Sequence, residues 1–151
     1  MGKFLEITYD KFIFRVKTDC FYTKDDFWVY LQGKIATVGV TDFQQKVRGD
    51  VVFLETIKPG TEAKQGQGIG TIETIKATFE ILSPVTGKVV EVNPDMYENP
   101  YLINQDPYGT GWIYRIELID PEGDKVGLLK AEDYFEVMKE KINQEAKKLY
   151  G

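Results

Sequence analysis

The sequence has no histidine and only one cysteine, Cys20, among its 151 residues. Without histidine the chain cannot use Ser-His or Cys-His nucleophilic catalysis, and it lacks the usual general base near neutral pH. One cysteine excludes an internal disulfide and a cysteine-rich zinc site within one chain, and it fits a reducing compartment. Catalysis by a pair of carboxylates stays open, but so few catalytic groups favour a protein that binds, carries or scaffolds, with neither catalytic residues nor a metal site.

Long apolar runs and an excess of positive charge are also missing. No run reaches the roughly 18 apolar residues of a membrane-spanning helix, and the N-terminal residues do not form a secretory signal. The 19 basic and 24 acidic residues give a net charge of −5, which argues against a nucleic-acid partner. We expect a cytoplasmic monomer without a membrane partner. The apolar fraction of 42% over this length predicts a single domain spanning residues 1–151.

The chain does contain a series of short strands separated by glycine and proline turns. Runs of β-branched, aromatic and other apolar residues predict strands at 12–16, 28–31, 35–40, 50–56, 88–93 and 112–118. Two helices are expected: a short one at 41–47, with Thr41 as N-cap and Gln44 as capping-box partner, and a C-terminal one at 130–149. Residues 1–20 form an extension to which the sequence assigns no role.

A faint internal repeat lies in the middle of the chain. Residues 49–52 (Gly-Asp-Val-Val) match residues 87–90 (Gly-Lys-Val-Val), 38 residues further on. Two similar halves joined by a hairpin would form a flattened barrel with an approximate two-fold axis. The predicted fold is therefore mainly β: a flattened barrel or sandwich of short antiparallel strands, with short peripheral helices and a C-terminal helix.

The hairpin between these halves carries one lysine at its tip. Lys76 lies between two β-forming segments, 69–72 and 78–82, and a Ser-Pro-Val-Thr-Gly turn at 83–87 leads into the next strand. A lysine at a hairpin tip is exposed and sterically open, which suits the attachment of a covalent arm. The alternative is an ordinary solvated lysine, which is the usual state of this residue type.

Four segments, in order, resemble the H protein of the glycine cleavage system. The most specific is the hairpin, where residues 73–77 (Glu-Thr-Ile-Lys-Ala) precede the turn at 83–87. The family has Glu-Ser-Val-Lys-Ala before Ser-Pro-Val-Ser-Gly. The resemblance covers about four-fifths of the chain, from Tyr22 to the C-terminal helix, and its other segments are 28–29 with 36–43, 49–61 and 99–112.

The resemblance implies a lipoyl-type fold and a non-catalytic carrier. Lys76 would hold lipoic acid in amide linkage, and Glu73 would be a recognition carboxylate, its alternative being a plain solvent-facing strand residue. The implied partners are a lipoate ligase or lipoyl transferase, a pyridoxal-phosphate glycine decarboxylase, a tetrahydrofolate-dependent aminomethyltransferase and dihydrolipoyl dehydrogenase. In that system the carrier takes an aminomethyl group from the decarboxylase to the aminomethyltransferase.

Two positions depart from the family pattern. Asp26 stands where the family usually has histidine, and Phe79 puts a bulky aromatic residue near the arm. Two alternatives therefore stay open: an H-like lipoyl carrier for another pathway, such as sulfur-compound oxidation, and a binding module whose Lys76 stays unmodified. A biotin carrier is disfavoured because Met-Lys-Met normally marks the biotin site, and residues 74–77 do not resemble it.

Overall fold

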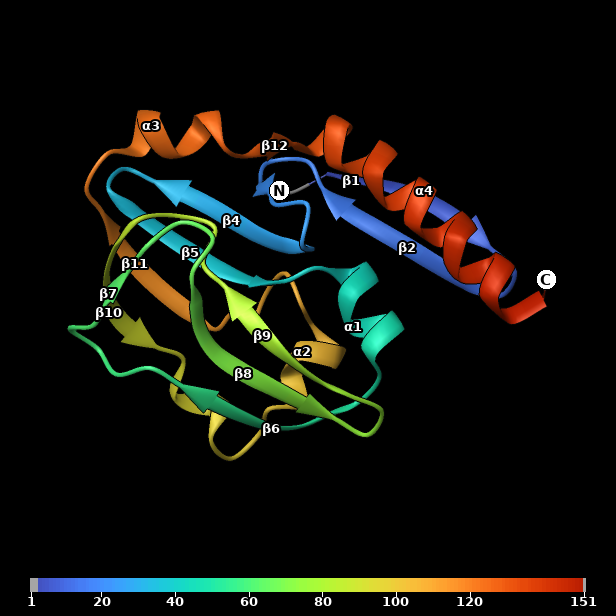
Figure 1. The fold of residues 1–151 in the computed structure, drawn as a ribbon, viewed down its shortest axis with the longest axis horizontal. Coiled ribbons are helices and arrows are strands. Elements are labelled where there is room, and N and C mark those ends of the chain that lie inside the picture. Colours follow the sequence, from blue (N-terminus) through green and yellow to red (C-terminus); the bar gives the residue numbers. More distant parts are fainter. Residues whose placement is uncertain (1–2, 151) are drawn as a thin grey trace.

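Two antiparallel sheets form the body of the molecule (Figure 1). The computed structural model describes residues 3–150, with side chains for residues 3–146. The larger sheet has the strand order β12-β3-β4-β5-β11-β10-β7. Its strands are β3 (Phe21–Tyr22), β4 (Phe27–Gln32), β5 (Ile35–Val40), β7 (Glu62–Ala63), β10 (Gly87–Val92), β11 (Tyr114–Leu118) and β12 (Leu129–Lys130). The smaller sheet has the order β6-β8-β9, from β6 (Val51–Thr56), β8 (Gly68–Thr74) and β9 (Thr78–Leu82).

The two sheets enclose the larger of two hydrophobic clusters. Ile72 and Ile81 of the smaller sheet pack with Val38, Val89 and Ile116 of the larger one, and each of the five is at most 1% exposed. Strands that alternate apolar and polar residues put the apolar ones on the inner faces of both sheets. The predicted fold class, mainly β with short antiparallel strands, is therefore confirmed.

The two halves of the sequence repeat lead into strands of different sheets. Residues 49–52 enter β6, and residues 87–90 form the start of β10. The two glycines are needed for different reasons. Gly49 has a φ of +95°, a backbone conformation that residues with a side chain rarely adopt. Gly87 is needed for space, because a Cβ there would come within 2.1 Å of the Glu117 carbonyl oxygen.

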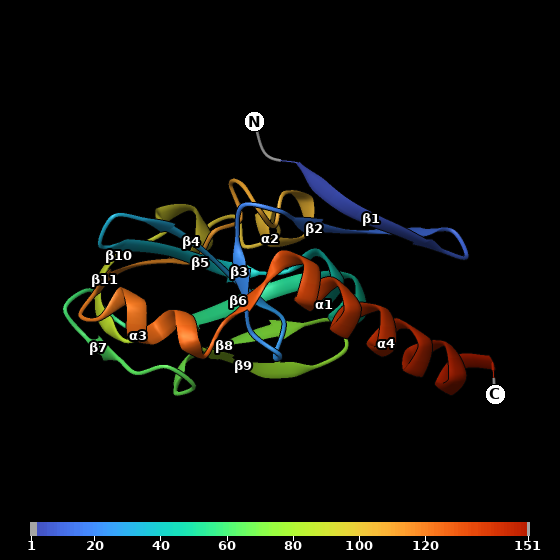
Figure 2. The same ribbon diagram turned by 90° about the horizontal axis from the view of Figure 1, so that it is seen from above.

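A hairpin and a helix from the two ends of the chain lie side by side at one end of the body (Figures 1 and 2). They are β1 (Phe4–Tyr9), β2 (Phe12–Lys17) and α4 (Ala131–Tyr150). The predicted C-terminal helix at 130–149 is confirmed to within one residue. The N-terminal extension is structured: most of it is this hairpin, which the sequence analysis assigned only in its second strand.

The hairpin and α4 cover the second hydrophobic cluster. Tyr134, Met138 and Ile142 recur at helical spacing and form the buried face of α4. Val16 of β2 and Tyr22 of β3 meet them, and the ring of Tyr22 stacks on that of Tyr134 with centroids 4.6 Å apart. The ends of the chain are thus fixed by packing rather than by a disulfide.

The helix α1 (Asp42–Arg48) follows β5 and begins as predicted, but the capping box is incomplete. The Gln44 amide N–H donates to the Thr41 hydroxyl at 3.2 Å, so Thr41 is the N-cap. The predicted return bond from the Gln44 side chain is wrong. That side chain donates to the Asp25 carbonyl at 3.2 Å, because the Thr41 N–H is already bonded to the Asp26 carbonyl at 3.1 Å.

The remaining helices are short and peripheral. They are the 3-10 turn η1 (Pro94–Met96), α2 (Leu102–Gln105) and α3 (Pro121–Val126). None of the described helices combines the length and apolar character needed to cross a membrane. The strand predicted at 112–118 begins at Tyr114, because Gly111 and Trp112 belong to the preceding turn.

Asp26 joins the body of the molecule to α4. Its carboxylate accepts hydrogen bonds from the Tyr134 hydroxyl at 2.6 Å and from the Lys141 ammonium at 2.8 Å. The Tyr134 hydroxyl also lies 3.1 Å from that of Thr41. Burial raises the pKa of the Asp26 carboxyl above its usual value of 3.8. The hydrogen bonds from Lys141 and Tyr134 lower this pKa, and the nearby charge of Asp25 raises it, but burial has the largest effect.

This raised pKa makes the stability contribution of Asp26 depend on pH. In the folded protein Asp26 takes up a proton at a higher pH than in the unfolded chain, so protonation of Asp26 favours folding. This stabilisation is complete below the pKa of the unfolded chain and is lost as the pH rises through the pKa of the folded protein. Relative to Asp26→Asn, wild-type protein should gain free energy of unfolding as the pH falls from about 7 to about 4. Urea denaturation at a series of pH values tests this, with Asp95→Asn as a control at an exposed carboxylate elsewhere in the fold; a constant difference between wild type and Asp26→Asn would contradict it.

Candidate functional site

The turn between β8 and β9 presents Lys76 to solvent. Three residues form it, Ile75, Lys76 and Ala77, and Ile75 is 67% exposed. The Lys76 side chain is exposed, and its ammonium group forms no hydrogen bond or ion pair with any other residue that the structure describes. The predicted hairpin and the predicted position of Lys76 at its tip are both found here.

The hydroxyl of Thr74 holds this turn together from inside. It accepts hydrogen bonds from the N–H groups of Lys76, at 3.2 Å, and Ala77, at 3.0 Å, and it donates to the Arg48 carbonyl at 2.7 Å. The Thr74 N–H also donates to the Ala77 carbonyl at 2.8 Å. Thr74 is only 6% exposed, so these groups have little access to water and the bonds restrict the turn strongly.

A second set of bonds fixes the turn to the segment that follows α1. The Ile75 N–H donates to the Asp50 carbonyl at 3.0 Å. Asn104 of α2 supports that segment from below: its side-chain NH₂ donates to the Gly49 carbonyl at 3.1 Å, and its side-chain oxygen accepts from the Val51 N–H at 2.8 Å. The backbone that carries Lys76 is therefore held on two sides.

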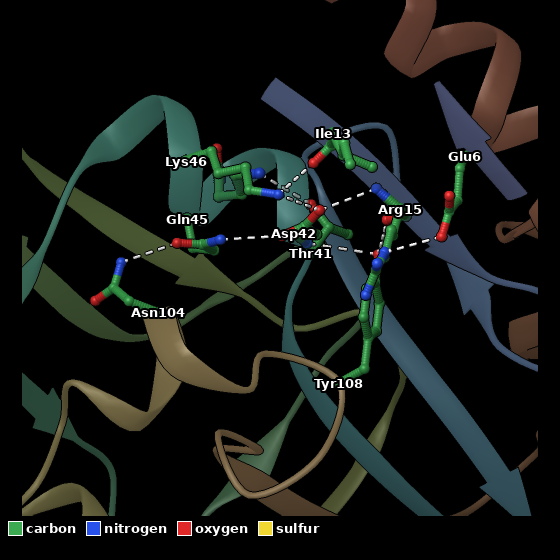
Figure 3. Close-up of polar contacts among 10 residues, drawn as sticks. Glu6, Ile13, Arg15, Thr41, Asp42, Gln45, Lys46, Asn104 and Tyr108 are labelled. Carbon is green, nitrogen blue, oxygen red and sulfur yellow. Dashed lines mark hydrogen bonds and ion pairs between the residues drawn. The ribbon is translucent and has the colours of Figure 1, made fainter. Parts of the chain in front are cut away.

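The same network continues through α1 to the N-terminal hairpin (Figure 3). Asn104 also donates to the Gln45 side-chain oxygen at 3.1 Å, and Gln45 donates to Asp42 at 3.0 Å. Asp42, 6% exposed, accepts from the Arg15 N–H of β2 and from the Lys46 ammonium, each at 2.9 Å. Lys46 donates in turn to the Ile13 carbonyl.

The stem of Lys76 lies across the end of α1. A Cβ added to Gly49 would sit 3.4 Å from the Cγ and Cδ atoms of Lys76. The side chain is thus aimed along the surface toward α1 and the hairpin, while its terminal nitrogen stays open. A primary amine that has no partner in the described part of the chain, on a turn held by hydrogen bonds, fits an amide-linked prosthetic group.

Glu73 lies on β8, the central strand of the smaller sheet, and its side chain faces solvent. It lies opposite Phe53 of β6 and Thr78 of β9 in the sheet register. Its carboxylate is exposed and forms no hydrogen bond or ion pair with the other described residues, while Phe53 is 57% exposed beside it. Glu73 and Lys76 therefore present free groups on the same hairpin.

Two other residues singled out in the sequence have structural roles. Phe79 is half-buried, and the Arg48 guanidinium lies 4.8 Å from the centre of its ring. Cys20 is 4% exposed, and burial raises the pKa of its thiol to about 12, so the thiol stays protonated and unreactive.

Comparison with known proteins decides the family. A sequence model described as glycine cleavage H-protein matches residues 20–141. The chain belongs to the glycine cleavage H-protein family. A probable glycine cleavage system H protein of Aeropyrum pernix is 40% identical over 140 residues, which cover 93% of this chain and 97% of that protein. The glycine cleavage system H protein of Carboxydothermus hydrogenoformans is 42% identical over 125 residues, covering 83% and 95%.

A solved structure agrees with the fold. The crystal structure of a glycine cleavage system H protein from Mycobacterium marinum superposes with a TM-score of 0.67 at 29% identity, covering 78% of this chain and 94% of that one. Proteins of this family are non-catalytic lipoyl carriers of the glycine cleavage system and interact with its other components. The resemblance drawn from four sequence segments is thus confirmed at the level of the family.

Sequence reasoning missed the residues that support the site. Thr74 was named only as part of the motif at 73–77, although a threonine hydroxyl can bond the backbone N–H two residues further on in a turn. Asp42 and Asn104 lay within segments that resemble the family, but nothing local assigned them a role. Their contacts span 27 residues, from Asp42 to Arg15, and 55 residues, from Asn104 to Gly49.

The hydroxyl of Thr74 should determine how rigid the turn is. Thr74→Val keeps the shape but leaves the Arg48 carbonyl and two turn N–H groups without this partner, so we expect a loss of about 1–3 kcal/mol in stability. Amide exchange of Lys76 and Ala77 should become about tenfold faster, with smaller changes in Thr74→Ser. Hydrogen exchange by NMR measures both; unchanged rates in Thr74→Val would contradict this role.

Proposed function

We propose that Lys76 carries lipoic acid in amide linkage and that the chain shuttles an aminomethyl group from glycine decarboxylase to aminomethyltransferase. The observation that carries the proposal is a solvent-exposed lysine, with no partner for its amine among the described residues, on a turn fixed by Thr74 inside the segment that matches the family. A rigid turn presents the amine in one place, while the lysine stem supplies reach.

The lipoyl group, when bound, supplies a disulfide and dithiol pair that can take up a one-carbon unit and undergo thiol–disulfide exchange. The chain itself fixes where the lipoyl group is attached and how it is presented. Thr74 and Asp50 hold the backbone of the turn, so Lys76 is presented the same way to each partner. Tethering raises the effective concentration of the carried group at each active site, provided that the partner can reach the turn.

The hairpin also offers a surface by which enzymes could recognise Lys76. Phe53 and Ile75 are large apolar residues exposed by 57% and 67%, and Glu73 lies opposite Phe53. An exposed aromatic residue beside an exposed carboxylate suits a partner with an apolar patch and a cation. We propose that this face, formed by Phe53, Glu73 and Ile75, is read by the lipoate ligase or lipoyl transferase and by the partner enzymes, among them dihydrolipoyl dehydrogenase.

The structure offers explanations for the two departures from the family pattern. Asp26 is bonded to Tyr134 and Lys141 and so serves the packing of α4. Phe79 lies under the Arg48 guanidinium. Both side chains therefore have a structural role within this chain, and their presence does not require a partner from a different pathway. This favours glycine cleavage over sulfur-compound oxidation. A buried, protonated Cys20 accords with the proposed cytoplasmic location.

Lipoylation of Lys76 is tested by intact-protein mass spectrometry with peptide mapping, after expression with a lipoate ligase and lipoate. We expect one lipoyl group on the peptide containing Lys76, none on Lys76→Arg, and full modification of Lys64→Arg, a control at another exposed lysine. An unmodified wild-type chain beside a modified known H protein would favour the binding module. Failure of the lipoylated protein as a substrate of glycine decarboxylase would favour another pathway.

Glu73 should matter for recognition and little for stability. Glu73→Gln removes the charge from an exposed position, and because a hydrogen bond to a charged group contributes about 1.5–3 kcal/mol, we expect lipoylation to slow by about tenfold or more. Glu55→Gln, which changes an exposed carboxylate on β6, is the matched control. Ligase kinetics with each variant give the answer; equal kcat/KM for both variants and wild type would leave Glu73 as an ordinary strand residue.

A further inference from the structure

The N-terminal hairpin is a separate two-stranded sheet, in which β1 and β2 pair only with each other. Asp10 and Lys11 form the turn between the strands, and Tyr9 lies opposite Phe12. A two-residue turn is closed by a hydrogen-bonded pair, and such pairs then alternate along the two strands. The backbone groups of every second residue on each strand therefore point away from the hairpin.

Side chains cover the outer edge of β2. The Arg15 N–H donates to the Asp42 carboxylate at 2.9 Å, and the Lys46 ammonium donates to the Ile13 carbonyl (Figure 3). Hydroxyl groups of two tyrosines donate to the Arg15 and Lys17 carbonyls, at 2.8 and 2.6 Å. This edge is therefore closed to a further strand.

The outer edge of β1 has no such cover. Phe4, Glu6 and Thr8 point their N–H and C=O groups away from β2, and these groups have no hydrogen-bond partner among the residues that the structure describes. All three residues are exposed. Figure 2 shows β1 as the outer strand of the hairpin, on the side away from α1. Free backbone groups at alternate positions of a strand form a template on which another strand can pair.

The strand β1 also lacks the features that proteins use to protect an open edge. Its segment Phe4–Tyr9 contains no proline, glycine or lysine, and no bulge interrupts its register with β2. Its only charged residue, Glu6, is bonded to the Arg15 guanidinium at 3.0 Å, which offsets the charge. Phenylalanine, isoleucine, threonine and tyrosine, which supply most of the segment, favour strands. We therefore expect this edge to be covered by a strand.

A second copy of β1 matches the open edge. The outward groups of Phe4, Glu6 and Thr8 are spaced symmetrically about Glu6, so an antiparallel copy presents the same groups in reverse order. Phe4 then lies opposite Thr8 of the other copy, and Glu6 lies opposite Glu6, in hydrogen-bonded pairs. The two Glu6 carboxylates face each other, but each is already bonded to Arg15 of its own chain.

The position of α4 leaves room for this pairing. The helix packs on one face of the hairpin, against both β1 and β2. Two strands at the usual spacing of about 4.8 Å span about 10 Å, which matches the distance of about 8–10 Å between packed helices. Two copies therefore form a four-stranded sheet with one helix over each hairpin. Leu5 and Ile7, which are half-buried beside α4, gain cover from the same residues of the other copy.

We propose that β1 pairs with β1 of a second copy of this chain, about a two-fold axis through Glu6, and that the chain acts as a dimer. This dimer replaces the monomer expected from the sequence, and it does not depend on lipoylation. Since α1 lies against the other edge of the hairpin and the β8–β9 turn is bonded to the end of α1, pairing through β1 leaves Lys76 accessible. One dimer then presents two attachment lysines, which raises the local concentration of carried groups at a partner.

Sedimentation equilibrium of the full-length chain at about 10–100 µM tests the dimer. Glu6→Pro removes an N–H that the β1–β2 pairing does not use, so the hairpin can form while its edge is blocked. We expect it to raise the dissociation constant of the dimer by about tenfold or more, and Thr8→Pro to act in the same way.

The matched control is Glu6→Ala, which also loses the bond to Arg15 but keeps its N–H. It should dimerise at least as well as wild type, because it removes two facing carboxylates. Far-UV circular dichroism and urea denaturation of each variant check that the chain is folded.

A cross-link tests the alignment of the two strands. Glu6→Cys puts one thiol of each copy at the two-fold axis, and the roughly 5.5 Å between the Cα atoms of a hydrogen-bonded pair suits a disulfide. We expect a mild thiol oxidant to convert most of the Glu6→Cys protein to a covalent dimer. Thr8→Cys should stay uncrosslinked, because Thr8 faces Phe4 of the other copy. The native Cys20 is 4% exposed and does not compete.

The outcomes separate this proposal from the proposed function. A monomeric wild type overturns the dimer, and so does a dimer that either proline leaves unchanged or that Glu6→Ala weakens as much. A dimer in which Glu6→Cys fails to cross-link, or in which Thr8→Cys cross-links as readily, also overturns it. A dimer weakened by both prolines and cross-linked at Glu6→Cys alone supports it. An unmodified Lys76 in mass spectrometry removes the proposed function and leaves the dimer standing.

Discussion

The buried carboxylate of Asp42 is the interaction on which the arrangement of the site depends. It lies at the first residue of α1, where the partial positive charge of a helix N-terminus favours an anion, and it accepts bonds from Arg15, Gln45 and Lys46. A buried carboxylate without these donors would be costly, so the donors must stay close. One side chain thereby fixes the N-terminal hairpin against α1 and orients the residues that reach toward the turn.

From Asp42 the bonds lead to the lysine-bearing turn in a few steps. Gln45 and Asn104 carry the network to Gly49, and Thr74 and Ile75 bond to the residues on either side of that glycine. Each link is short, partly shielded from water and made by a different element. The backbone of the turn is therefore held by hydrogen bonds, although Ile75 and Lys76 at its tip are exposed. A carrier needs a fixed base of this kind below an accessible attachment point.

How far the sequence predicts this structure depends on the range of the contacts. The hairpin tip at Lys76, the Thr41 cap and the buried face of α4 follow from turn residues and periodicity, which are local signals. The strand β1 was missed even though Leu5, Ile7 and Tyr9 alternate with exposed residues, because residues 1–20 were treated only as an extension without an assigned role. The predicted bond between the Gln44 side chain and the Thr41 N–H does not form, because that N–H is bonded to the Asp26 carbonyl. The bond from Tyr134 to Asp26 spans 108 residues, so no local pattern could reveal it.

The absence of histidine is consistent with the role of this fold as a carrier. A carrier that hands its cargo to other enzymes needs no general base of its own, and a residue titrating near neutral pH beside the turn would make its charge vary with conditions. The position where the family usually has histidine holds Asp26, whose carboxylate is enclosed by Tyr134 and Lys141. These bonds from Asp26 hold α4 against the body of the molecule, and α4 packs on the second hydrophobic cluster together with the hairpin. The surface around Lys76 is thus shaped by packing at the two ends of the chain, as suits a non-catalytic carrier that leaves the chemistry to other components.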